Sequence, residues 1–261
     1  MKKTIAFLFC LFFSIYFSQS KNFYYSYVYN IDSNNIKRIK EEVFFLHIKE
    51  KSSLFTSVKN YKSDSMVAII KQDYLKFGGG VSFKGVPKTD FTYYIIKKRD
   101  SLTHNVFYDK IGRNNFFYDE PWVNNCKIEN EVRTINGFNC QKATIKKFGR
   151  NFIAWFANEI AISEEPYKFN GLPGLIVDLY DEKKYFHFSL INYNPKENRE
   201  YEIPNDRMIK LVQSEKDKFV IGFKSYKESL PSRIRASGIA SEDRIKQIQD
   251  RIDSENLTIE R

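Results

Sequence analysis

Apolar and polar positions alternate along most of this chain. Between residues 22 and 31 every second side chain is aromatic, which is the period of a strand that buries one face. Short runs of the same kind recur as far as residue 193. They predict strands at 22–31, 42–49, 53–58, 91–98, 103–109, 115–119, 127–135, 139–147, 152–156, 175–180 and 185–193. The pattern is therefore that of a mainly β protein.

The segments between these strands are short and rich in turn residues. Asn136-Gly137 is a strong hairpin dipeptide, and Gly112–Asn114 and Phe148–Asn151 form similar breaks. Strand 185–193 follows strand 175–180 closely enough to pair with it. Parallel strands need long crossovers, so repeated short turns predict an antiparallel sheet.

Three segments have helical spacing instead. Residues 61–72 are predicted to be helical, with Ser63 or Asp64 as a candidate cap. Residues 214–227 have a mixed pattern that also allows a helix. In residues 242–253, Ile245, Ile248 and Ile252 share one helical face. Gly78–Gly80 is predicted to be a flexible loop and 231–238 a linker. The fold class is thus mainly β (α+β), with one or two helices against the sheet and a helical C-terminal segment.

The stretch Asn170–Ile176 is the most distinctive local sequence. Gly171 and Gly174 bracket Pro173, and an apolar run follows at once. Glycine allows backbone angles that a side chain forbids, and proline fixes its own φ, so a tight structural turn is predicted that aims a buried strand. The Lys-Ser/Thr pair of a phosphate loop and the GxGxxG pattern of a dinucleotide site do not accompany it.

The first twenty residues resemble a cleaved signal peptide. Lys2 and Lys3 precede an apolar stretch from Ile5 to Phe17, and small residues follow at Ser18 and Ser20. The apolar stretch is shorter than the roughly 20 residues of a membrane span, and no later stretch is apolar enough to cross a bilayer. The expected organisation is a signal peptide at 1–20, a β-rich domain at 21–200 and a helical extension of the same domain at 201–261. The expected location is the periplasm, the cell envelope or the outside of the cell.

Export changes the interpretation of the cysteines. Cys126 and Cys140 remain after cleavage, and an oxidising compartment makes a disulfide between them the expected state. Their spacing is too wide for a redox Cys-x-x-Cys pair, and no histidine lies near them as a metal ligand would. We therefore predict a structural disulfide, no metal and no cofactor.

The charge is moderately basic, with 42 Lys and Arg against 32 Asp and Glu. The two signs are interspersed, so a nucleic-acid partner is not expected. The balance indicates a solvated charged surface, with a weak attraction to anionic glycans or membrane surfaces as the alternative. His47, His104 and His187 are scattered and match no catalytic motif. Asp109, Asp119 and Glu120 remain as candidate acids and bases, because glycoside hydrolysis needs only two placed carboxylates.

Four segments stand out together: Gly171–Ile176, Ile135–Ala143, Phe148–Phe156 and Pro166–Phe169. In combination they resemble the GLPGLI family of exported bacterial proteins, whose signature matches Gly171–Ile176, with Glu165 where the family has Gly. The likeness covers most of 23–193. It implies a curved antiparallel sheet or half-barrel, similar to the bowl-like N-terminal domain of a bacterial peptide:N-glycosidase. It also implies a largely uncharacterised family, whose genes often lie near TonB-dependent outer-membrane receptors.

Aromatic residues around the signature are the best candidates for binding. Either they fill the core, or a curved sheet presents them to a ligand, with polar groups at the rim. The candidate binding residues are Trp155, Phe156, Tyr167, Phe169, Arg150 and Asn170. The expected function is a non-catalytic envelope module that binds a glycan, peptide or lipid, with a structural or assembly partner and an envelope hydrolase as the alternatives.

Overall fold

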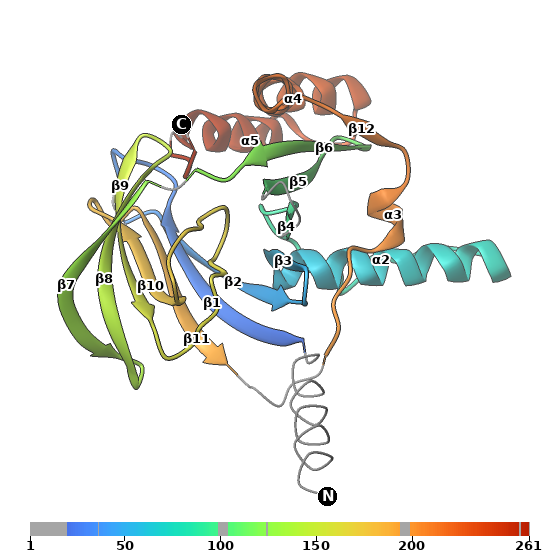
Figure 1. The fold of residues 1–261 in the computed structure, drawn as a ribbon. Helices are drawn as coiled ribbons and strands as arrows, with labels where there is room; N and C mark the ends of the chain where they lie inside the picture. Colours follow the sequence, from blue (N-terminus) through green and yellow to red (C-terminus); the bar gives the residue numbers. More distant parts are fainter. Residues whose placement is uncertain are drawn as a thin grey trace, which may run out of the picture.

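The protein forms one large β-sheet with helices packed around it (Figure 1). The computed structural model describes residues 20–35, 37–98, 104–123, 125–193, 199–255 and 257–260, so nearly all of the predicted signal peptide lies outside the described residues. The strands are β1 Lys21–Asn30, β2 Ile39–Ile48, β3 Ser52–Ser57, β4 Tyr94–Lys98, β5 His104–Ile111, β6 Asn114–Pro121, β7 Cys126–Ile135, β8 Phe138–Lys147, β9 Arg150–Ala157, β10 Leu175–Asp181, β11 Phe186–Tyr193 and β12 Leu211–Gln213. The helices are α2 Val58–Phe77, α3 Asn205–Met208, α4 Lys216–Ser237 and α5 Glu242–Ser254.

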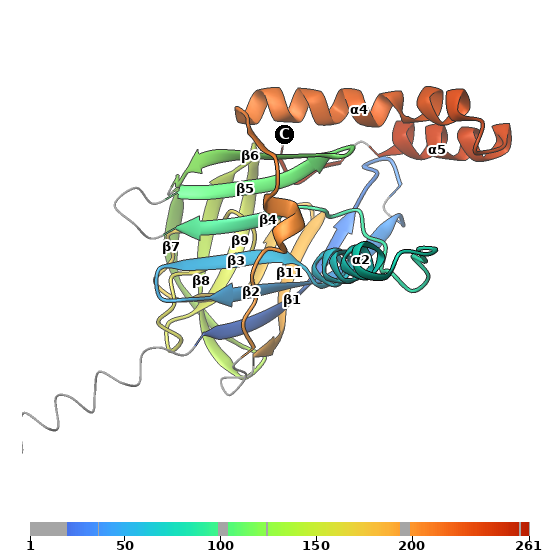
Figure 2. The ribbon, with the colours of Figure 1, turned by 90° about the vertical axis from the view of Figure 1, so that its right-hand side faces the viewer.

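The twelve strands lie in the order β12-β6-β5-β4-β3-β2-β1-β11-β10-β9-β8-β7. Neighbours are antiparallel except β12, which runs parallel to β6. The sheet bends into an open bowl, with β7–β11 on one side and β3–β6 on the other (Figures 1 and 2). The predicted fold class, a mainly β chain with a curved antiparallel sheet and a helical C-terminal segment, is confirmed.

Local turn chemistry accounts for much of this arrangement. Asn136 and Gly137 both have positive φ, as do Phe148 and Gly149, which is the backbone of tight two-residue hairpins. The predicted pairing of the strands on either side of 182–185 is present, with Leu179 opposite Phe188.

Two helix predictions need correction. α2 begins earlier than expected, because the Ser57 Oγ accepts hydrogen bonds from the backbone N–H groups of Lys59 and Asn60 and so caps the helix; Ser63 and Asp64 lie within it. Residues 231–238 belong mostly to α4 and are not a linker. Pro231 removes one helical hydrogen bond but is buried, and the left-handed Gly238 ends the helix.

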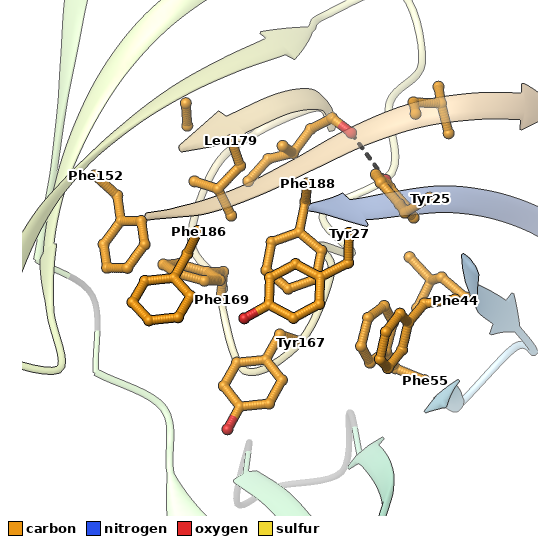
Figure 3. Packing of buried hydrophobic residues seen from close by; sticks show 14 of the residues in the cluster. Tyr25, Tyr27, Phe44, Phe55, Phe152, Tyr167, Phe169, Leu179, Phe186 and Phe188 are labelled. Carbon is orange, nitrogen blue, oxygen red and sulfur yellow. Dashed lines mark hydrogen bonds between the residues drawn. The ribbon is translucent and has the colours of Figure 1, made fainter. Parts of the chain in front are cut away.

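The main core fills the concave face of the bowl. Figure 3 shows Tyr25, Tyr27, Phe44 and Phe188 from the sheet packed close to Tyr167 and Phe169, which come from the segment between β9 and β10. A smaller core on the other face joins Phe45, Leu54 and Tyr94 to Tyr201. Adjacent residues of a strand point to opposite faces, so Phe44 and Phe45 serve different cores.

The predicted disulfide is wrong: Cys126 and Cys140 are both free. The two residues do lie on paired strands, but Cys126 faces Ile145 while Cys140 faces Arg133. At about 3.3 Å per residue, this offset separates the two cysteines by roughly 16 Å along the strands. A disulfide requires Cα atoms within about 7 Å. The Asn136-Gly137 turn sets this register and keeps the thiols apart.

In the described part of the chain, no helix has the length and apolar character needed to cross a membrane.

Candidate functional site

The segment 158–174, between β9 and β10, folds into the bowl and carries charged residues with it. Glu164, Glu165 and Lys168 are buried there alongside Tyr167 and Phe169. The predicted turn has the geometry that its glycines permit: Gly171 has a φ of 104°. A Cβ on Gly174 would lie 2.3 Å from the backbone oxygen of Ala157, so only glycine lets the chain pass this close to β9.

Lys97 of β4 holds this segment in place by hydrogen bonds to its backbone. Its Nζ donates hydrogen bonds to the backbone oxygens of Glu165 (2.5 Å) and Phe169 (2.6 Å). The Glu165 carboxylate accepts a hydrogen bond of 2.7 Å from the backbone N–H of Leu172, which closes the turn. Burial raises the pKa of Glu165 to about 7, although the charge of Lys97 opposes the shift.

A second group of charges, the ion cluster, consists of Glu120, Lys168, Lys216 and Glu260. The Lys168 Nζ lies 2.8 Å from Glu120, 2.6 Å from Glu260 and 2.9 Å from the hydroxyl of Tyr118. Lys216, at the start of α4, contacts both carboxylates at 2.6 and 2.7 Å. Burial alone would raise the pKa of Glu260, but the two ammonium groups outweigh it and hold that pKa below its usual value. The cluster joins four separate segments of the chain.

Beside the ion cluster, a pocket of about 540 Å³ opens at the turn between β8 and β9, and we call it the rim pocket. Lys146, Lys147, Phe148, Arg150 and Glu120 are among its lining residues. Burial, followed by repulsion from Lys97, lowers the pKa of Lys147 to about 8. The Arg150 guanidinium donates to the backbone oxygen of Thr258 at 3.2 Å and lies over the ring of Phe186. The lining thus holds three cationic residues, Lys146, Lys147 and Arg150, against one acidic residue, Glu120.

Of the six predicted binding residues, only Arg150 lies in the rim pocket. Phe156, Tyr167, Phe169 and Asn170 are buried in the bowl. Trp155 alternates with Phe156 and so points to the other face, where the guanidinium of Arg133 covers it at 3.7 Å. Ligand binding by these five residues stays a prediction. Lys146 and Lys147 were not among the predicted binding residues, because their only signal in the sequence is a pair of cations directly before a tight turn.

The candidate acids and bases do not converge. Asp109 is buried and accepts hydrogen bonds from Thr92 (2.7 Å) and the backbone of Lys110 (2.8 Å). Asp119 and Glu120 are consecutive on β6, so their side chains leave opposite faces of the sheet. Two carboxylates that flank one bond, as glycoside hydrolysis requires, are not formed by these three residues.

His187 does meet an aspartate and a serine, but in the wrong geometry for a catalytic triad. Its Nε2 lies 2.6 Å from Asp178 and 3.0 Å from the hydroxyl of Ser189. A triad needs the acid on one ring nitrogen and the nucleophile on the other. Across the residues that the structure describes, His, Cys, Asp and Glu also form no group of three that could hold a metal ion.

Comparison with known proteins yields a structural likeness only. No family model matches the chain, and no curated protein matches it. Among solved structures, PNGF-II is similar in two crystal forms, each with a TM-score of 0.54, at 10% and 11% sequence identity. The match covers 80% of this chain and 34% of that one, so the chain spans about a third of the length of PNGF-II. At this identity the likeness shows that the chain has a distantly similar fold.

Proposed function

We propose that this chain is an exported, non-catalytic binding protein of the cell envelope, a member of the GLPGLI family, whose rim pocket holds an anionic glycan. The rim pocket carries the proposal. Its volume of about 540 Å³ lies within the range of small-ligand sites, and its lining includes Lys147 and Arg150, which pair across the β8–β9 hairpin, and the neighbouring Lys146.

The charge at the pocket favours an acidic ligand. Its acidic lining residue, Glu120, already contacts Lys168 at 2.8 Å and Lys216 at 2.6 Å, so it does not cancel the pocket's own cations. A guanidinium matches the two oxygens of a carboxylate, and Lys146 adds an exposed point charge. A uronic acid would present its carboxylate to these cations.

The pocket also offers a surface for a sugar ring. Phe148 lines it, and the ammonium groups of Lys147 and Lys216 lie 5.4 and 5.7 Å from the centre of that ring. A lipid chain would find only two large apolar side chains in this lining, Val123 and Phe148. The distant fold likeness to a peptide:N-glycosidase agrees with a glycan ligand.

Calorimetric titration with an oligogalacturonate and with a neutral oligosaccharide of the same length tests the proposal. The acidic sugar should bind, and Lys146→Glu should weaken its binding about tenfold or more, because it replaces attraction by repulsion at close range. Lys224→Glu, an exposed position on α4, is the matched control and should bind as the unaltered chain does. Equal binding of both sugars, or no effect of Lys146→Glu, would refute the proposal, and turnover of the sugar would refute its non-catalytic part.

An assembly role is the second candidate, and the end of the sheet favours it. β7 is the last strand in the sheet order, so one edge of its backbone can pair with another chain. A TonB-dependent receptor is the partner that the family resemblance implies. Co-purification of such a receptor, lost when a proline is placed in β7 and retained by Lys146→Glu, would favour assembly over glycan binding.

A further inference from the structure

α2 leaves the body of the protein after its first turns. Near its start, Asp64 accepts a hydrogen bond from the Tyr94 hydroxyl at 2.8 Å and pairs with Arg207 at 3.3 Å. Lys71 makes a last ion pair, at 3.1 Å, with Asp206 of α3. Beyond that point the helix projects from the sheet, as Figure 1 shows.

The projecting end, residues 69–83, is unusually apolar for an exposed segment, and we call it the α2 tip. Ile70 is partly buried, but the other large apolar side chains of the tip are at least half exposed, from 50% for Val81 to 82% for Phe77. The exposed set is Ile69, Tyr74, Leu75, Phe77, Val81 and Phe83. Contiguous exposed apolar surface of this kind marks a site of interaction with another molecule or with a membrane.

The arrangement of these side chains favours a membrane over a protein groove. Successive helix residues are rotated by about 100°, so Tyr74 and Phe77 share one side of the helix, whereas Ile69 and Leu75 point to two other sides. A groove covers one side of a helix and would leave part of this set in water. The interface of a bilayer surrounds an inserted tip and would bury all of it. Tyrosine and phenylalanine are suited to that depth.

The charges around the tip identify the kind of bilayer. Lys76, Lys84 and Lys88 are exposed and flank the apolar residues, whereas Asp73 is the acidic residue within the tip. Lysine stems can lie along apolar surface while the ammonium groups reach lipid phosphates. We propose that the α2 tip inserts into the interface of an anionic lipid bilayer and holds the bowl beside it.

Flotation with lipid vesicles tests this directly. The full chain should bind vesicles of phosphatidylcholine with phosphatidylglycerol, and Leu75→Ser/Phe77→Ser should lower the partition coefficient at least about tenfold, since two large side chains lose their burial. The control is Val220→Ser/Ile221→Ser, which removes exposed apolar side chains from α4 and should change nothing. Because residues 5–17 could themselves bind lipid, every comparison is between variants of the same chain.

A second pair of variants tests the charge. Lys76→Glu/Lys84→Glu should abolish the preference for phosphatidylglycerol over pure phosphatidylcholine. Unchanged binding by the tip variants would overturn the proposal. So would vesicle-independent self-association that the serine pair abolishes, since the tip would then bind a second copy of the chain. The tip variants should retain glycan binding at the rim pocket, so the two proposals can fail separately.

Discussion

Individual residues inside the bowl show how far burial can change a side chain's chemistry. Glu165 stands where the resembled motif has glycine, and its side chain caps the turn by accepting a hydrogen bond from Leu172. The carboxyl group is buried, so the neutral form is favoured and the pKa rises to about 7. The sequence showed a substituted motif position, but it could not show that Lys97, from a strand far away in the chain, would lie beneath it.

Glu165→Gln should change the pH dependence of stability. A raised carboxyl pKa means that the folded chain holds the proton more tightly than the unfolded chain. The stability that the protonated Glu165 carboxyl gives to the folded chain is fully present below about pH 4.5 and is lost as the pH rises through about 7. Since glutamine does not titrate, the variant should be more stable than the unaltered chain at pH 8, by on the order of 3 kcal/mol, and equal to it near pH 4. Urea unfolding at both pH values measures the difference, and a difference that does not vary with pH would contradict the assignment.

At the scale of elements, alternation and turn residues were enough to predict the strands. The strands from 22–31 to 185–193 all lie within a few residues of their predicted positions, because each signal is contained in its own segment. The features that were missed depend on distant partners. β12 is only three residues long and exists because it pairs with β6, which lies about ninety residues earlier in the chain. The rim pocket likewise needs β6 and the β8–β9 turn together.

The turn before β10 can be tested at the same scale. Gly174→Ala would place a methyl group 2.3 Å from the Ala157 oxygen, and both atoms belong to backbone that cannot move freely. We expect a loss of about 2–4 kcal/mol in the free energy of unfolding. Gly80→Ala is the matched control: its Cβ would meet nothing within 4 Å, so the change should stay within about 0.5 kcal/mol. Equal effects at the two glycines would contradict the close-packing argument.

At the scale of the whole molecule, the ion cluster holds together parts that the sheet alone does not join. Lys168 comes from inside the bowl, Glu120 from β6, Lys216 from α4 and Glu260 from the segment after α5. The same final segment also receives the hydrogen bond from Arg150 and buries Leu257 in the main core. The C-terminal region predicted as an extension therefore shares the core of the sheet.

Lys168→Met should loosen this connection. It leaves two carboxylates with Lys216 as the remaining cation of the cluster, and breaking a buried ion pair costs about 3–5 kcal/mol. Hydrogen exchange should also become faster in residues 257–260. Lys224→Met, which removes an exposed lysine 3.9 Å from Glu228, should alter neither quantity. Unchanged exchange at 257–260 would mean that Lys168 does not hold the final segment.

The position of β1 at the middle of the sheet has a consequence for how the chain reaches this structure. β1 pairs with β2 through a short connection. Its other edge pairs with β11, a strand far away in the sequence, and Tyr27 lies opposite Phe188 there; we call this β1–β11 pairing the seam. Strands on each side of this seam can form from neighbouring hairpins, whereas the seam itself requires closing a very long loop. During synthesis the N-terminal half therefore emerges with an open, aromatic-rich edge. Such an edge can pair with another chain, so early arrival of the second half favours folding over aggregation.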